Sequence, residues 1–120
     1  MPHVPIALQL WSLRDDQKKD FAATAAAVAK IGYTGVELAG TGNLDAKGAK
    51  AALDDAGLKV AGMHVGIGAL TADLNAVVND ALLFGTRHVV CPSWPVAQFA
   101  TAASCQRIGE RLGEIGATLR

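Results

Sequence analysis

The sequence predicts an α/β protein in which parallel strands alternate with helices. Short apolar segments alternate with alanine-rich segments of helical periodicity along the 120-residue chain. Glycines suited to helix ends recur at a nearly regular spacing, at Gly32, Gly57 and Gly85. The strand segments are apolar enough to be buried on both faces, as is usual in a parallel sheet. Repeated strand–helix units of this length imply right-handed crossovers.

The first unit shows the signals most clearly. An apolar run over 6–13 follows Pro5 and is limited by polar residues after it, which favours a strand. Residues 20–31 are rich in alanine, the best helix former, and Asp20 can cap the first turn. A second strand is expected over 35–39.

The same order of signals continues to the end of the chain. Each later helix is preceded by a residue that can cap it, and two of them are followed by a glycine. The remaining expected elements are a helix over 45–56, a strand over 59–65, a helix over 72–84 capped by Thr71, a strand over 88–91, and a helix from Thr101 to the C-terminus.

Composition excludes several classes of protein. Hydrophobic residues make up 51% and charged residues 18%, so the chain is neither disordered nor a coiled coil. Eleven basic residues balance 11 acidic ones, and a net charge of zero does not favour nucleic acid or anionic membranes. No apolar run is long enough to span a membrane, and the first residues do not resemble a signal peptide.

The two cysteines, Cys91 and Cys105, lack CxxC or zinc-ribbon spacing. We expect them to be partly buried thiols in a reducing compartment, and therefore predict a cytoplasmic protein. No linker or low-complexity segment divides the chain, so residues 1–120 are expected to form a single domain. Four strand–helix units fit either a small doubly wound sheet or half of an eight-unit barrel, and their period does not decide between them.

Polar side chains stand near the carboxyl ends of the expected strands, where α/β proteins carry their sites. By the two-residue period of a strand, Gln9 and Trp11 share one face. Glu37 lies between apolar residues, a position costly for a carboxylate unless it is paired or functional. His64 ends the neighbouring strand, and Trp94 follows the fourth.

Neighbouring parallel strands are about 4.8 Å apart, so Glu37 and His64 can reach one ligand and polarise a hydroxyl or move a proton. Trp11 and Trp94 can stack on the apolar face of a sugar. The alternative interpretation is structural: a hydrogen-bonded carboxylate, a core histidine and packed indoles.

Two other motifs are less convincing. The segment 40–45 follows a strand and opens a helix like a dinucleotide loop, but Asp45 replaces the third glycine and places a negative charge where a pyrophosphate would bind. Asp15 and Asp16 resemble an acidic receiver pair, but the third strand ends in His64 rather than aspartate. We interpret the charged residues Asp15, Asp16, Lys18, Lys19 and Asp20 as a solvated loop and helix entry.

The chain also resembles a known family. The segment Gln9-Leu10-Trp11-Ser12-Leu13-Arg14-Asp15 and the segment Gly32-Tyr33-Thr34-Gly35-Val36-Glu37-Leu38 are similar to the opening of xylose isomerase-like TIM barrels, the sugar phosphate isomerase/epimerase group. Residues 56–64 resemble its third unit and 85–92 its fourth. The resemblance covers essentially the whole chain and implies a (βα)4 half of a TIM barrel, the N-terminal half.

The resemblance implies a divalent-metal enzyme (Mn, Mg, Co or Zn) that isomerises or epimerises sugars or sugar phosphates beside a carbonyl. Glu37 and His64 match its pocket positions on strands two and three. Its metal ligands come mostly from strands five to eight, so we expect no metal on this chain alone. The related endonuclease IV-like group draws zinc ligands from strands three and four, and this chain has no histidine at the carboxyl end of strand four.

A four-stranded half leaves both sheet edges free, which favours a homo-oligomer, most simply a homodimer. We expect the chain to be cut, or to end naturally, at the middle of the barrel. Two functions remain open from the sequence. The first is an isomerase/epimerase-like domain, the N-terminal half of a barrel, which need not be active alone. The second is a non-catalytic, self-associating fold module.

Overall fold

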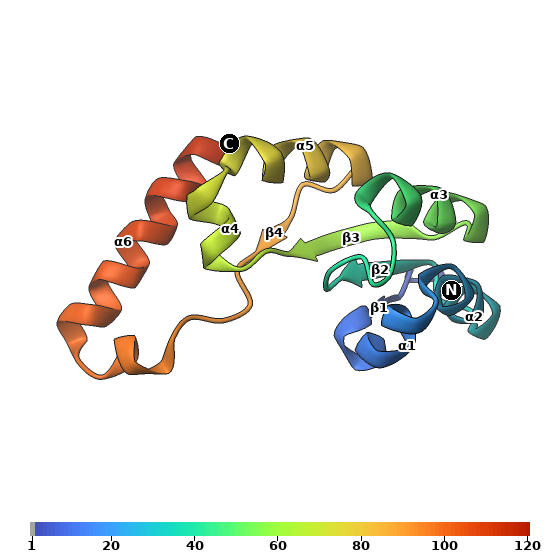
Figure 1. Cartoon of the computed structure of the whole chain (residues 1–120), viewed down its shortest axis with the longest axis horizontal. Helices are drawn as coiled ribbons and strands as arrows, with labels where there is room; N and C mark the ends of the chain where they lie inside the picture. Colours follow the sequence, from blue (N-terminus) through green and yellow to red (C-terminus); the bar gives the residue numbers. More distant parts are fainter. Residues whose placement is uncertain (1) are drawn as a thin grey trace.

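The four strands form one parallel sheet in the order β1-β2-β3-β4 (Figure 1). The structure is a computed structural model that describes residues 2–120. Strand order follows chain order without a reversal, which is the arrangement of a barrel wall and not of a doubly wound sheet. The fold is therefore a (βα)4 half-barrel. The strands are Ala7–Gln9 (β1), Gly35–Leu38 (β2), Lys59–His64 (β3) and Val89–Val90 (β4).

The helices begin and end where local chemistry predicts. Asp20, Asp45 and Asp73 each accept a hydrogen bond from a backbone N–H in the first turn of the following helix. The glycines predicted to end three helices are all left-handed. The helical segments are η1 (Leu10–Leu13), α1 (Arg14–Lys19), α2 (Phe21–Ile31), α3 (Ala46–Ala56), α4 (Ile67–Ala72), α5 (Leu74–Phe84), η2 (Val96–Phe99) and α6 (Ala102–Leu119).

The first strand is shorter than expected. It stops at Gln9, and the 3₁₀ turn η1 follows, so the two-residue period that placed Trp11 beside Gln9 was wrong. The turn brings Leu10 into the core, where it is almost fully buried. The loop expected over 15–20 is also corrected: residues 14–19 form α1, with acidic residues in its first turn and lysines in its last, as the helix dipole favours.

The helix expected over 72–84 is two helices, α4 and α5, separated at Asp73. Thr71 does not cap α5, because its hydroxyl donates to the carbonyl of Ile67 within α4. Asp73 has non-helical backbone angles (φ −152°, ψ 88°), and its carboxylate accepts from the N–H of Ala76. A carboxylate two residues beyond the expected threonine therefore sets the start of α5. The other elements differ from expectation only at their ends.

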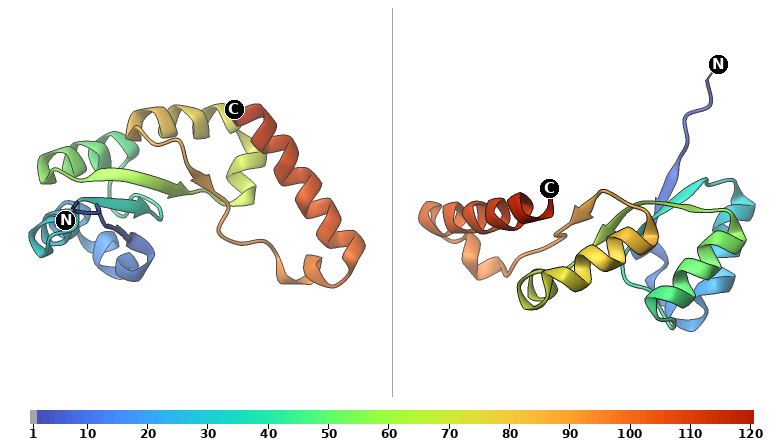
Figure 2. Two further views of the ribbon diagram at one scale, coloured as in Figure 1. Left: turned by 180° about the vertical axis from the view of Figure 1, so that it is seen from behind. Right: turned by 90° about the horizontal axis from the view of Figure 1, so that it is seen from above.

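The sheet is buried on one face. Side chains that point toward the helices, such as Val36, Leu38 and Met63, join a core with Phe21 and Leu53. Side chains on the other face are exposed or half-buried: Ala7, Gln9, Glu37, His64 and Val90. The expectation of burial on both faces was wrong, because the face that would line a closed barrel has no covering layer among residues 2–120. Figure 2 shows the helices arranged around the outer side of the strands.

The last helix projects away from the sheet. α6 packs against η2, and only its C-terminal end approaches α5 (Figures 1 and 2). Thr101 caps it as predicted, in a reciprocal capping box with Ser104. Among residues 2–120, no helix combines the length and apolar character needed to cross a membrane.

Candidate active site

Three of the predicted site residues meet on the open face of the sheet. Gln9 is the last residue of β1, Glu37 lies one residue before the end of β2, and His64 ends β3. The strand register pairs Gln9 with Glu37, and an irregularity of register after Val36 sets the position of β3 beside them. Because the strands are parallel, their carboxyl ends coincide and the three polar groups cluster there.

The Glu37 carboxylate is the centre of this cluster. Its Oε1 atom lies 2.6 Å from Nε2 of His64 and accepts a 2.8 Å hydrogen bond from Nε2 of Gln9. An unprotonated ring nitrogen at that distance from a carboxylate oxygen would be repelled, so the contact is favourable when Nε2 of His64 carries a proton, and it is an ion pair when the imidazole is charged. The 3.4 Å approach of the two nitrogens of Gln9 and His64 is then a contact between two donors.

The second carboxylate oxygen of Glu37 remains available. Among residues 2–120, no hydrogen bond to Oε2 is formed. The side chain of Glu37 is 31% exposed and that of His64 is 16% exposed, so both are held by the protein and still reach solvent. The cluster therefore presents one oriented carboxylate oxygen to any molecule bound on this face.

A cleft of about 650 Å³ opens over the cluster, large enough for a small sugar. Its lining combines the polar cluster with an indole and with the segment that follows β4. The lining residues are Gln9, Trp11, Glu37, His64, Val90, Cys91, Pro92 and Ser93. Residues 90–93 close the side of the cleft opposite β1, and the sequence analysis had not assigned them to the site.

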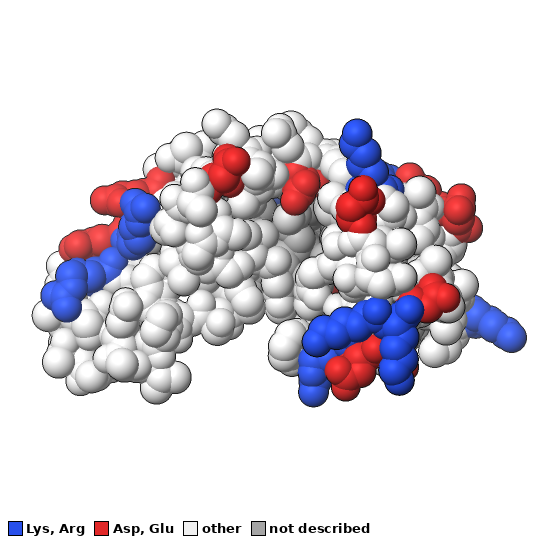
Figure 3. Space-filling model, in the orientation of Figure 1, with Lys and Arg blue, Asp and Glu red and all other residues white. Residues whose placement is uncertain are grey.

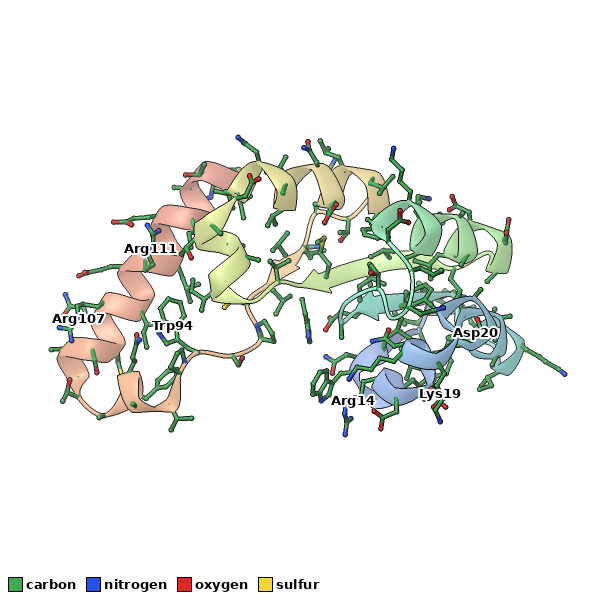
Figure 4. All side chains as sticks on the ribbon, viewed as in Figure 1. Arg14, Lys19, Asp20, Trp94, Arg107 and Arg111 are labelled. Atoms are coloured by element: carbon green, nitrogen blue, oxygen red, sulfur yellow. The ribbon has the colours of Figure 1, made fainter. Side chains whose placement is uncertain are left out.

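Trp11 reaches the cleft although it does not lie on a strand. Its side chain is 57% exposed, and the guanidinium of Arg14 lies 4.9 Å from the ring centroid (Figure 4 labels Arg14). Arg14 Nη1 also donates to the Trp11 carbonyl at 3.0 Å. The cation–π contact and this hydrogen bond hold the indole at the rim. Sequence reasoning missed Arg14, and its three-residue separation from Trp11 in a helical turn was the available signal.

Trp94 does not join the cluster. The chain leaves the sheet after Pro92 and carries Trp94 toward η2 and α6 (Figure 4). Its indole N–H donates to Oε1 of Gln98 at 2.6 Å, and it is absent from the lining of the cleft. The structure therefore gives Trp94 a local packing role in the described chain.

Both cysteines are free thiols, as expected from their spacing. Cys91 is half-buried at the wall of the cleft, and its thiol donates to the carbonyl of Ser93. Cys105 is exposed on α6, so the expectation that both thiols are partly buried was wrong for this one.

The glycine-rich loop after β2 is explained by packing. Gly42 has φ +62°, and a Cβ atom there would lie 2.0 Å from the carbonyl oxygen of Gln17. The Gln17 amide donates to the Ala39 carbonyl at 2.8 Å, and Asn43 accepts from the N–H of Phe21. The loop is therefore attached to α1 and α2 by hydrogen bonds. This close packing explains why a glycine stands at position 42, and no bound nucleotide is needed to explain it.

The residues of the described chain do not fit a divalent metal ion. Among residues 2–120, no group of three or more His, Cys, Asp or Glu side chains is arranged to hold one. Glu37 and His64 offer one carboxylate and one imidazole, whereas a divalent ion takes four to eight ligands. The two groups also bond to each other. The chemistry proposed below is therefore built from the side chains themselves.

Charges on the surface are mixed. On the face in Figure 3, basic and acidic side chains are interspersed over the helices, and the centre of that face carries few charges. This pattern agrees with the balanced composition, and it gives no continuous basic surface on the side shown.

Comparison with known proteins confirms the fold. No known family profile matches the sequence, and no curated protein is significantly similar to it. Among the solved structures that match are two that are both described as a sugar phosphate isomerase/epimerase from Parabacteroides distasonis ATCC 8503. The first is 23% identical, covers 78% of this chain and 43% of its own, and has a TM-score of 0.63. The second is 21% identical, covers 99% and 49%, and has a TM-score of 0.62.

The chain thus has the fold of part of these structures and spans less than half the length of each. The resemblance drawn from the sequence to sugar phosphate isomerase/epimerase barrels is confirmed at the level of fold. Together with the strand order, it defines the class of protein as an α/β half-barrel with a polar cluster at the carboxyl ends of its strands.

Proposed function

We propose that this chain is an isomerase/epimerase-like domain that moves a proton at the carbon beside a carbonyl in a sugar or sugar phosphate. One observation carries the proposal: the Glu37–His64–Gln9 cluster, with a 2.6 Å central contact, lies beneath a cleft of about 650 Å³ at the carboxyl ends of the strands. A carboxylate and an imidazole in contact are a general acid–base pair.

In this proposal Glu37 is the base. Its free Oε2 takes the proton from the carbon beside the carbonyl. The electron pair of that C–H bond forms a C=C bond, and the π pair of the carbonyl moves to the carbonyl oxygen to give an enediolate. Isomerisation then moves the hydroxyl proton from the second oxygen to the first and returns the carbon-bound proton from Glu37 to the former carbonyl carbon. Epimerisation instead adds a proton from solvent to the opposite face of the original carbon, and Glu37 releases its own proton to water.

Gln9 and His64 hold the base in place. The hydrogen bond from Gln9 and the contact with His64 both fall on Oε1 and restrain the carboxylate, and Oε2 is left without a hydrogen-bond partner among the described residues. Trp11 offers a flat apolar surface for the C–H face of a sugar ring. The proposed substrate class is therefore a small polyol with a carbonyl group, with or without a phosphate.

Two comparisons support the sugar assignment: both matching structures are described as sugar phosphate isomerase/epimerase. Since the chain spans less than half of each, the activity of a whole barrel is a proposal for this chain. We also propose that residues 1–120 fold as a single domain and that it is cytoplasmic. Limited proteolysis and cell fractionation test these two statements.

Exchange of hydrogen with solvent tests the chemistry. The purified chain is incubated in D₂O with a panel of aldoses, ketoses and their phosphates, and ¹H NMR follows loss of the signal beside the carbonyl. We expect deuterium incorporation into at least one sugar, reduced about 100-fold or more by Glu37→Gln. Glu110→Gln, at an exposed position on α6, is the matched control and should leave the rate unchanged.

Two results would refute the assignment. If Glu37→Gln exchanges as fast as the parent chain, Glu37 is not the base. If no sugar of the panel exchanges, the non-catalytic fold module is favoured instead. A folded circular dichroism spectrum for each variant keeps these outcomes separate from misfolding.

A further inference from the structure

β3 contains a bulge beside Glu37. The ladder between β2 and β3 is regular up to Val60. Glu37 then pairs with Gly62, which leaves Ala61 without a partner on β2. Bulges of this kind bend a strand locally and re-aim the side chains that follow. Here the bulge places a glycine directly opposite the carboxylate of the polar cluster.

The bulge also decides which face His64 takes. Side chains alternate along a strand, so one extra residue turns all the later side chains to the opposite face. If the ladder continued without a bulge, Met63 would point toward the cleft and His64 toward the helices. With the bulge, Met63 is buried in the core and Nε2 of His64 reaches Glu37. The local path of β3 therefore builds the contact between the two site residues.

Gly62 has no side chain where the Glu37 carboxylate lies. A Cβ atom built on Gly62 would be 3.7 Å from Oε2 of Glu37, and 3.5 Å from both the Cβ atom and the carbonyl oxygen of His88. These are ordinary contact distances, so one methyl group fits. Any further atoms would meet the carboxylate on one side and His88 on the other. Gly62 is itself buried, which agrees with a carboxylate lying over it.

The backbone does not require a glycine at position 62. Its φ is not in the left-handed region, and no atom comes closer to the built Cβ than 3.5 Å. Gly35 on β2 is the contrast, because a Cβ atom there would lie 2.8 Å from the carbonyl oxygen of Lys59. A glycine in the interior of a strand weakens it and often marks a close approach by another group. At Gly62 the approaching group is the Glu37 carboxylate.

We propose that Gly62 is a positioning residue of the acid–base cluster. The space that it leaves lets the Glu37 carboxylate lie across β3 and contact His64. Gly62 acts through Glu37, and its catalytic consequence rests on the proposed function. The contact itself is formed without any substrate, and every residue involved lies on β2 or β3 or directly before β4.

¹⁵N NMR of the His64 imidazole tests the positioning without a substrate. Gly62→Val adds two γ carbons, and the carboxylate gives way because it is the end of a flexible side chain. The Nε2 signal of Gly62→Val should therefore move to the value found in Glu37→Ala. Gly62→Val combined with Glu37→Ala should give no further change, since the glycine acts through the carboxylate.

Gly62→Ala is the conservative variant. Its Cβ atom makes only ordinary contacts, so the Nε2 signal of His64 should stay at the parent value. Its midpoint of urea unfolding should be unchanged or higher, because alanine restricts the unfolded chain more than glycine does. A lower midpoint would show that the fold itself requires glycine at this position.

Gly66→Val is the matched control. Gly66 follows β3 with an extended backbone (φ −65°, ψ 154°), nothing lies within 4 Å of its built Cβ, and it is not part of the cleft lining. The same substitution there should leave the Nε2 signal of His64 unchanged. Gly62→Thr has the same number of γ atoms and takes the place of the valine variant if that variant does not fold.

Activity separates this inference from the proposed function. In the D₂O exchange assay, Gly62→Val should lower the rate about ten-fold or more and affect kcat more than KM, because it displaces the base. If the parent chain exchanges no sugar, the proposed function fails, and the NMR comparison still decides the role of Gly62. A folded Gly62→Val with the parent Nε2 signal, or an equal change in Gly66→Val, would overturn the proposal.

Discussion

Glu37 shows how a single polar residue is kept in an apolar strand. Its neighbours Val36 and Leu38 face the helices and are buried, while its own side chain turns to the open face. There the carboxylate accepts a hydrogen bond from Gln9 and contacts the imidazole Nε2 of His64. Hydrogen bonds to a charged acceptor are stronger than neutral ones, and they offset the cost of partial burial. The same arrangement that stabilises the residue orients it for chemistry.

At the scale of single residues, Gly42 should be intolerant of a side chain. Gly42→Ala puts a Cβ atom 2.0 Å from the Gln17 carbonyl in a left-handed conformation, so we expect a loss of about 2–3 kcal/mol in the free energy of unfolding. Gly40→Ala is the control: its φ is +80° but nothing lies within 4 Å, so strain alone should cost about 1 kcal/mol. Urea denaturation measures both, and equal losses would contradict the packing explanation.

At the scale of elements, aspartate caps position the helices that cover the sheet. Asp20 is the clearest case, because it separates α1 from α2 and its carboxylate accepts from the Ala23 N–H at 2.9 Å. α2 in turn buries Phe21 and Val28 beneath the strands that carry the site. A cap is therefore connected, through packing, to the placement of β1 and β2.

Removal of this cap should destabilise the protein without unfolding it. Asp20→Ala leaves the first turn of α2 without its acceptor and should lower the free energy of unfolding by about 1 kcal/mol. Asp20→Asn keeps a side-chain oxygen and should retain most of the stability. Thermal unfolding followed by circular dichroism compares the two, and equal losses would show that the cap hydrogen bond is not the source of the effect.

At the scale of the whole molecule, the sequence was enough to predict most of the fold. It was not enough to predict which face of the sheet is buried. Helix ends followed from Asp20, Asp45 and the stop glycines, since caps are local chemistry. The meeting of Glu37 with His64 followed from parallel topology, whereas the strand order was expected only from the family resemblance. The one-sided burial did not follow, because the apolar pattern of a strand does not reveal which face lacks a partner.

Two site residues show the limit of sequence reasoning in detail. Trp11 reaches the cleft through a 3₁₀ turn rather than the predicted strand, and its partner Arg14 had been considered only as one of the polar residues that limit that strand. Trp94 was expected at the site and lies elsewhere, because the path of the chain after Pro92 depends on packing with η2 and α6. The two-residue period of a strand therefore predicts the positions of residues within the strand better than those of residues beyond the end of the strand.

The central claim is that parallel strands bring Glu37 and His64 into direct contact on the open face. ¹⁵N NMR of the His64 imidazole tests it most directly. The account predicts a proton on Nε2 and a clear change of the Nε2 signal in Glu37→Ala, with no change in Glu110→Ala. A proton on Nδ1 alone, or an Nε2 signal indifferent to Glu37→Ala, would contradict it.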